Sequence, residues 1–114
     1  MSDCIFCKIG AGEIPSDKVF EGDSLFAFRD IQPQAPVHIV IIPKKHIATM
    51  NDFTGADSGL LSEMMLACRE LAAQEGLSDS GYRIVINCNS DGGQSVFHVH
   101  AHLLGGRKMT WPPG

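Results

Sequence analysis

The sequence lacks the features that mark membrane, secreted and nucleic-acid-binding proteins. Its longest apolar run, Val37 to Ile42, is far shorter than the ~20 residues that a membrane span needs. The N-terminus has no apolar segment with basic residues before it and a cleavage site after it, so we expect no signal peptide and a cytoplasmic location. Nine basic and thirteen acidic residues give a net charge of −4, which argues against a general binder of nucleic acids or membrane surfaces.

Internal repeats, low-complexity tracts and linkers are also absent, so residues 1–114 are expected to form one domain. A chain of this length can bury a core without disulfide bonds. It has four cysteines, and without a secretory signal the spacing Cys4-x-x-Cys7 favours metal or redox chemistry over a structural disulfide. We interpret Cys68 and Cys88 as small buried apolar residues.

Turn-forming residues divide the chain into short strands and one main helix. Apolar residues recur at helical spacing at Leu61, Met64, Met65, Cys68, Leu71 and Ala72, which indicates a helix with one buried face. We expect a helical turn over Asp3 to Ile9, strands over Lys18 to Glu21, Leu25 to Arg29, Val37 to Ile42, Tyr82 to Cys88 and Val96 to Leu104, and a helix that Asp57 or Ser58 caps and Gly76 closes. These elements indicate an α+β fold with an antiparallel sheet.

Three histidines occupy alternate positions in the run His98-Val99-His100-Ala101-His102. On a strand, residues two apart share a face and lie about 6.6 Å apart, so the three imidazoles are expected on one side of the chain. A strand does not need this arrangement in order to fold. Because histidine serves as nucleophile, proton carrier or metal ligand near neutral pH, the run is the first place to look for chemistry.

The residues alone leave several interpretations of this run open. A single histidine on a half-buried strand is most often a structural residue, but three buried rings would each need partners for two nitrogens. Alternating histidines can converge on zinc. They can also form a phosphate site, and Gly92 and Gly93 favour this interpretation because glycine lets backbone N–H groups approach an anion closely.

The whole run from Gln94 to Gly106 resembles the His-x-His-x-His signature of the histidine-triad nucleotide-binding proteins. The resemblance continues through Asp30 to Pro36, Ile42 to His46, Asn87 and the tail Trp111-Pro112-Pro113-Gly114, and so covers nearly the whole chain. The pair Gln94-Ser95 and the Trp-Pro-Pro-Gly tail point to the purine nucleoside phosphoramidase branch.

This family resemblance implies a five-stranded antiparallel sheet with one main helix and a short N-terminal helix. It also implies a homodimer whose two sheets form one ten-stranded sheet. The implied activity is hydrolysis of purine nucleoside 5′-phosphoramidates to an amine and AMP or GMP, with neither nucleic acid nor membrane as a partner. Two alternatives are a nucleotide-responsive interaction protein with incidental turnover and a hydrolase of dinucleoside polyphosphates.

By similarity to the family, His100 is the nucleophile that attacks the α-phosphorus. A neutral imidazole suits this role because its ordinary pKa lies near 6.5 and it leaves readily once phosphorylated. His102 is expected to donate to a phosphate oxygen, and Ser95 to bond the phosphate or the leaving group. The family places His38 beside the triad as a partner of the nucleophile, although a single histidine is also a common core residue.

The resemblance also implies a nucleoside site. Asp30 is expected to accept hydrogen bonds from the ribose hydroxyls, and Trp111 to reach the site of the neighbouring protomer rather than only anchor the tail. The base is expected against Phe6, Ile9, Ile14 and Ile31, each of which could equally be plain core, and the phosphate against Asn87, Gly93, Gln94, Ser95 and Val96.

Cys4 and Cys7 need two further ligands to form a closed tetrahedral metal site. His46 and His98 are the candidates, because many bacterial members of the family use two cysteines and two histidines in this way. We therefore expect a structural zinc and no catalytic metal, since four protein ligands leave no position for water. The competing interpretation is a reduced cysteine pair beside an ordinary His98, and a catalytic zinc on the three triad histidines is less favoured.

Overall fold

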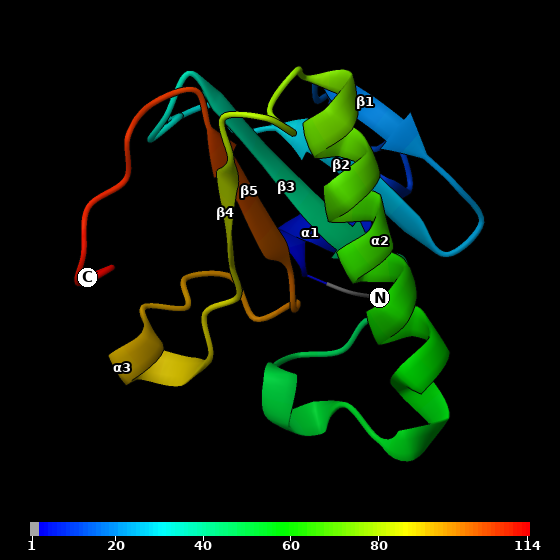
Figure 1. Ribbon diagram of the computed structural model, residues 1–114. Coiled ribbons are helices and arrows are strands. Elements are labelled where there is room, and N and C mark those ends of the chain that lie inside the picture. The colour runs from blue at the N-terminus through cyan, green and yellow to red at the C-terminus, as the bar shows by residue number, and fades with distance from the viewer. Residues whose placement is uncertain (1–2) are drawn as a thin grey trace.

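A five-stranded antiparallel sheet with one long helix across one face confirms the predicted α+β fold (Figure 1). The computed structural model describes residues 3–114. The strands are β1 (Lys18–Glu21), β2 (Leu25–Arg29), β3 (Val37–Pro43), β4 (Tyr82–Val85) and β5 (Ala101–Gly105), and they lie side by side in the order β1-β2-β3-β5-β4. The helices are α1 (Ile5–Gly10), α2 (Ser58–Gln74) and α3 (Asn89–Gly92), with two short 3₁₀ turns, η1 (Met50–Asp52) and η2 (Gly55–Asp57).

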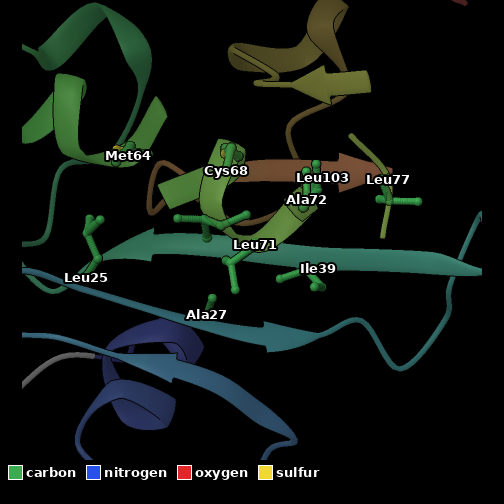
Figure 2. Packing of buried hydrophobic residues seen from close by; sticks show 11 residues of the cluster. Leu25, Ala27, Ile39, Met64, Cys68, Leu71, Ala72, Leu77 and Leu103 are labelled. Carbon is green, nitrogen blue, oxygen red and sulfur yellow. The ribbon is translucent and has the colours of Figure 1, made fainter. Parts of the chain in front are cut away.

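Odd-numbered residues of the inner strands face α2 and form the main core (Figure 2). Since successive side chains on a strand point to opposite faces, this parity places one whole set of apolar residues under the helix. The helix contributes Met64, Cys68, Leu71 and Ala72 to this core, so the predicted apolar face of the helix is confirmed. The strands contribute Leu25, Ala27, Ile39, Ile41, Ala101 and Leu103. Each large side chain buried here contributes about 1.5–3 kcal/mol.

Even-numbered residues of the same strands face α1, which lies behind the sheet in Figure 1. The α1 residues Phe6 and Ile9 pack against Phe26, Phe28, Val40 and Ile42 in a second, smaller core. The register sets Phe28 opposite Val40, and Val40 opposite His102. One row of side chains therefore runs across the sheet from an apolar cluster to the histidines.

The segment that carries the histidines differs from the prediction. The strand predicted over Val96 to Leu104 is shorter, because β5 begins at Ala101, whose partner on β3 is Ile41. Before that point the Val99 N–H donates to the Ile47 carbonyl at 2.7 Å, outside the sheet, so the chain bends past the loop that follows β3. His98 and His100 consequently lie just before the strand rather than within it.

Two further predicted boundaries need correction. The strand predicted over Tyr82 to Cys88 ends at Val85, because its partner β5 offers no paired residue beyond His102. Asp57 precedes α2 but does not cap it, since its carboxylate accepts from the Thr54 N–H at 3.0 Å and from Lys45 at 2.7 Å. Gly76 adopts a φ of +76° just past the helix, as its predicted role in closing the helix requires.

The short N-terminal helix is present as predicted, over Ile5–Gly10. The Cys4 sulfur accepts the Cys7 N–H at 3.4 Å and so caps the first turn of α1. Among residues 3–114, no helix is long and apolar enough to cross a membrane.

Candidate active site and metal centre

A pocket of about 350 Å³ lies on the face of the sheet that carries the even-numbered side chains. His100 and His102 line it together with Ser95 from the segment that precedes β5. Apolar side chains of α1 complete the wall, and the Phe6 ring meets the His100 ring edge-on, with ring centroids 4.9 Å apart. The pocket thus combines imidazole and hydroxyl groups with apolar side chains.

The hydrogen bonds of His100 fix which of its nitrogens can react. Its Nδ1 lies 2.7 Å from the backbone carbonyl oxygen of His98. A carbonyl oxygen only accepts, so Nδ1 carries the proton and the neutral ring keeps its lone pair on Nε2. Burial lowers the pKa of His100 below its ordinary value, although the bond to the His98 carbonyl opposes this shift. The neutral, nucleophilic form of the ring is therefore favoured at pH 7.

A second set of hydrogen bonds fixes the proton on His102. The Gln34 N–H donates to His38 Nδ1 at 3.0 Å, so the neutral His38 ring carries its proton on Nε2. That Nε2–H donates to His102 Nδ1 at 2.9 Å, which leaves the proton of His102 on its own Nε2. His38 therefore contacts the last histidine of the triad rather than the central one. This bond leaves the Nε2–H of His102 to donate to a ligand in the pocket.

Both rings of this pair are held in the neutral state. Burial lowers the pKa of His38, and the Asp30 carboxylate 3.5 Å from His38 Nε2 partly offsets this effect. Burial, together with the neighbouring His100 and His38, lowers the pKa of His102 to about 4. The pair thus keeps its hydrogen-bond directions throughout the neutral pH range.

Asp30 lies at the end of β2, where the chain turns into a short loop before β3. One carboxylate oxygen, Oδ1, accepts the Gln32 N–H at 2.8 Å, and the Asp30 N–H donates to the His38 carbonyl at 2.9 Å. The carboxylate lines the pocket. It is held in place by the backbone and can accept hydrogen bonds from a ligand hydroxyl.

A cluster of potential metal ligands includes the first histidine of the triad. One ligand atom from each of Cys4, Cys7, His46 and His98 falls within 4.8 Å of the others. The Nδ1 atoms of His46 and His98 are 3.2 Å apart, and sulfur–nitrogen separations run from 3.3 to 3.5 Å. A tetrahedral zinc site with ordinary bond lengths has nitrogen–nitrogen and sulfur–nitrogen separations of about 3.3–3.6 Å.

The protonation of His98 also suits a metal ligand. Its ring is fully buried, and its Nε2 lies 2.7 Å from the Pro43 carbonyl oxygen, so Nε2 carries the proton. The lone pair of His98 is then on Nδ1, directed at Cys4, Cys7 and His46. A ligating histidine whose other nitrogen donates to a carbonyl is the usual arrangement around zinc. The donor set and its spacing therefore fit a closed zinc site.

Asp30, His38 and His102 also place one potential ligand atom each within 4.8 Å of the others. Here the proton on His38 Nε2 lies between the two rings and already satisfies His102 Nδ1. Metal binding would have to displace that proton and break the Gln34 hydrogen bond. Hydrogen bonding is sufficient to account for this second cluster.

The structure brings most of the predicted site residues to the pocket. The predicted residues that line it are Phe6, Ile9, Ile14, Asp30, Ile31, Ser95, Val96, His100 and His102. Ile31 lies on its rim, with 91% of its surface exposed. Asn87, Gly93 and Gln94 are not part of the lining, and neither is Trp111, whose side chain is 82% exposed on the C-terminal tail.

The Gln94 side chain has a structural environment. Its Oε1 accepts the Asn89 N–H at 2.9 Å, and its Nε2 donates to the carbonyls of Ala48 and Val96 at 2.8 and 3.0 Å. The amide therefore fastens the turn after α3 to the loop before η1. Gln94 supports the segment that carries Ser95 while its own polar atoms are already paired.

Sequence reasoning missed several residues of the lining. Phe28 and Val40 belong to the even-numbered row, and their alternation with buried odd-numbered residues is the signal that could have found them. The others come from α1, from the loop before β1 and from the end of β2, and no local pattern distinguishes them: Ile5, Pro15, Ser16, Asp17, Arg29 and Gln32.

Comparison with known proteins gives consistent matches over nearly the whole chain. The sequence matches the HIT domain over residues 11–109. It is 54% identical over 112 residues to an uncharacterized HIT-like protein of Synechococcus elongatus, covering 98% of this chain and 97% of that protein. It is 49% identical over 107 residues to the purine nucleoside phosphoramidase of Escherichia coli, covering 94% of this chain and 90% of that enzyme. The crystal structure of a HIT family hydrolase from Legionella pneumophila has 61% sequence identity and a TM-score of 0.97, covering 98% of this chain and 100% of that one.

Proposed function

Because the chain belongs to the HIT domain family, we propose that it hydrolyses the P–N bond of purine nucleoside 5′-phosphoramidates, releasing an amine and AMP or GMP. The observation that carries this proposal is the hydrogen bond from His100 Nδ1 to the His98 carbonyl, which leaves a nucleophilic Nε2 on a ring that lines the pocket. The 49% identity to an Escherichia coli protein named purine nucleoside phosphoramidase supports the same reaction.

The reaction takes two displacements at phosphorus. The Nε2 lone pair of His100 attacks the α-phosphorus, the P–N bond breaks, and the amine leaves with the bonding electrons and takes up a proton. The nucleotidyl group is then bound to Nε2, and the Nδ1–H bond to the His98 carbonyl stabilises the positive ring. Water attacks the phosphorus in the second step, loses a proton, and displaces the imidazole to give the nucleoside monophosphate.

Hydrogen-bond donors around the phosphorus stabilise the charge that develops on its oxygens. His102 offers its Nε2–H because His38 occupies its Nδ1, and Ser95 offers a hydroxyl from the same wall of the pocket. Donors that are fixed in place before the reaction make the largest single contribution in many enzymes. In this proposal His38, His100, His102 and Ser95 form the catalytic group.

The rest of the pocket suits a nucleoside. Asp30 accepts hydrogen bonds from the ribose hydroxyls, since its carboxylate lines the pocket and is held by the Gln32 N–H. The base lies against the apolar side chains of Phe6, Ile9 and Ile14, with Ile31 at the rim. An apolar slot of this kind binds a purine through ring stacking and the burial of apolar surface, rather than through hydrogen bonds to the polar groups at the edges of the base.

Cys4, Cys7, His46 and His98 hold a structural zinc ion in this proposal, supported by their donor chemistry and spacing. A closed set of four ligands leaves no open position, so the ion activates no water. Its role is to tie α1, which forms one wall of the pocket, to His98 two residues before the nucleophile.

The chain acts as a homodimer in this proposal, with two sheets joined into one of ten strands. Within the described residues, β4 is the last strand of the order β1-β2-β3-β5-β4. One of its edges is therefore available to pair with a second copy of the protein. Trp111 is largely exposed. It follows Thr110, whose carbonyl accepts from Arg83 of β4 at 3.0 Å, so in this proposal Trp111 reaches from this edge to the pocket of the partner.

Steady-state hydrolysis of adenosine and guanosine 5′-phosphoramidates tests the proposed reaction. We expect turnover of both, and a loss of about 10³-fold or more in kcat for His100→Asn. AMP binding to the same variant, measured by calorimetry, should persist because the pocket walls remain. Diadenosine polyphosphates cleaved far faster than phosphoramidates, or full activity of the variant, would contradict the proposal.

A further inference from the structure

Arg107 lies outside the pocket, in the turn that follows β5, yet it is hydrogen-bonded to the loop between β2 and β3, just before the strand that carries His38. Its Nε donates to the Gln34 carbonyl at 3.0 Å, and its Nη1 donates to the Lys108 carbonyl at 3.3 Å. Arg107 is exposed, and no ion pair among the described residues includes it. Its closest polar contacts are therefore with the backbone rather than with an acidic side chain.

The turn before Arg107 is shaped to meet this loop. Gly106 has a φ of +92°, a conformation that other residues rarely adopt, and a Cβ added there would lie 2.9 Å from Pro36 Cβ. The loop on the other side is closed by its own hydrogen bonds, with the Gln34 side-chain amide donating to the Gln32 carbonyl at 2.9 Å. The Gly106 backbone thus packs against the Pro36 ring, and Arg107 hydrogen-bonds the two segments together.

The backbone of Gln34 makes two hydrogen bonds in different directions. Its carbonyl accepts from Arg107, and its N–H donates to His38 Nδ1 at 3.0 Å. The N–H and the carbonyl lie in the two peptide planes that meet at the Gln34 Cα. Because Arg107 holds the second plane, and with it the position of that Cα, it limits the freedom of the first plane, whose N–H points at His38. The guanidinium therefore acts, through one residue, on His38 and, through His38, on His102 in the lining of the pocket.

The direction of that N–H decides where two protons lie. With the Gln34 N–H in place, His38 Nδ1 is an acceptor, and the chain of bonds leaves a proton on His102 Nε2. Without it, His38 can carry its proton on Nδ1 and accept from His102 Nδ1. His102 Nε2 would then present a lone pair to the pocket, and a phosphate oxygen would meet an acceptor instead of a donor.

We propose that Arg107 is a positioning residue. It holds the backbone of Gln34 so that His38 and His102 keep the tautomers in which His102 points an N–H at the substrate phosphate. The expected effect on kcat rests on the proposed function, whereas the expected tautomers rest on the hydrogen bonds alone. Arg107 touches no reacting atom in this scheme.

Nitrogen NMR of the histidine rings in the full-length protein tests the assignment directly. In the wild type, at neutral pH, we expect the proton on Nε2 of both His38 and His102. Arg107→Met, which keeps a long side chain but has no donor, should populate the opposite tautomer of both rings, while Arg107→Lys, which keeps a donor, should restore much of the wild-type pattern. Arg69→Met is the matched control, because Arg69 is exposed on α2 and its bond is to the adjacent Glu70.

Kinetics with adenosine phosphoramidate supply the second readout. We expect Arg107→Met to lower kcat about five- to tenfold with a smaller change in KM, the effect of one hydrogen bond that strengthens in the transition state. Arg69→Met should match the wild type. Gly106→Ala, whose Cβ would press on Pro36, should shift the tautomers in the same direction as Arg107→Met.

The assignment is overturned if Arg107→Met leaves both tautomers unchanged, whatever happens to kcat, or if Arg69→Met alters them equally. It is also overturned if the tautomers shift and kcat does not. A wild-type protein with the expected tautomers but without phosphoramidase activity would instead refute the proposed function. The two failures are therefore distinguishable.

Discussion

The substitution Cys7→Ser should weaken both the fold and the nucleotide pocket, because Cys7 joins them. Its sulfur lies 3.4 Å from His46 Nδ1 and 3.5 Å from His98 Nδ1, so it belongs to the proposed zinc site. The same residue lies in α1, and its neighbour Phe6 forms part of the pocket wall. Losing one ligand should release zinc and free α1 from the segment that precedes the nucleophile.

The expected magnitude follows from mass action and chain length. A metal that binds only the folded protein, present at 100 to 1,000 times its Kd, stabilises it by about 2.7–4.1 kcal/mol. For a domain of this size, 1 kcal/mol shifts Tm by about 4 °C. Stripping zinc from the wild type should therefore lower Tm by about 11–16 °C, and Cys7→Ser should melt at the lower temperature whether or not zinc is present.

Thermal melts of metal-free and zinc-loaded protein, with metal content measured on protein without a histidine tag, provide the assay. Cys88→Ser is the matched control, since Cys88 lies outside the ligand cluster and that variant should respond to zinc like the wild type. The KM for the nucleotide should rise in Cys7→Ser as α1 loosens. An unchanged Tm after chelation, with far less than one zinc per chain, would refute the reasoning, as would a Cys7→Ser variant that still gains stability from zinc.

Two further predictions concern a titration and a close contact. The pKa of His102 is lowered from 6.5 to about 4, so the unfolded ring takes up its proton first and stability should fall as the pH drops from about 6.5 toward 4. Urea unfolding at pH 7 and pH 5 should show a smaller loss for His102→Gln than for the wild type, and equal losses would contradict the shift. Gly105→Ala would place a Cβ 2.5 Å from Leu77 Cδ1 in the main core, and overpacking of this kind costs about 1–3 kcal/mol. Gly55→Ala, with no atom within 4 Å of the added Cβ, is its control and should leave the unfolding midpoint unchanged.

Local patterns were sufficient to predict the α+β class, the long helix and the five strands, but not the order of the strands in the sheet. The hairpin Lys18–Glu21 and Leu25–Arg29 follows from its Gly-Asp-Ser turn, and α2 follows from its apolar spacing and the closing glycine. Such signals involve residues that are close in sequence. They are therefore readable without knowledge of the neighbouring elements.

Features that depend on distant segments could not be read in this way. β5 begins at Ala101 because its ladder with β3 begins there, and the chain before it bonds to Ile47 instead. The Asp57 carboxylate pairs with Lys45 and Thr54 rather than capping the helix. The sequence shows which groups are present, but the choice among competing partners is made by the three-dimensional arrangement.

The same distinction applies to the site. The alternation of histidines and the cysteine spacing pointed to groups that the structure brings together, and the family resemblance implied roles for them. The structure adds which partner each ring has. The register sets His38 opposite Leu104 and Val40 opposite His102, so His38 and His102 are diagonal neighbours on one face. This pairing and its link to Gln34 and Arg107 depend on segments up to 73 residues apart.

The account depends on His100 carrying the nucleotidyl group during turnover. Rapid acid-free quenching of the protein with adenosine 5′-phosphoramidate, followed by proteolysis and mass spectrometry, measures this directly. We predict an adenylyl group on His100 that disappears by hydrolysis once the substrate is used up and never forms in His100→Asn. An adduct on any other side chain, or turnover at full rate by that variant, would contradict the account.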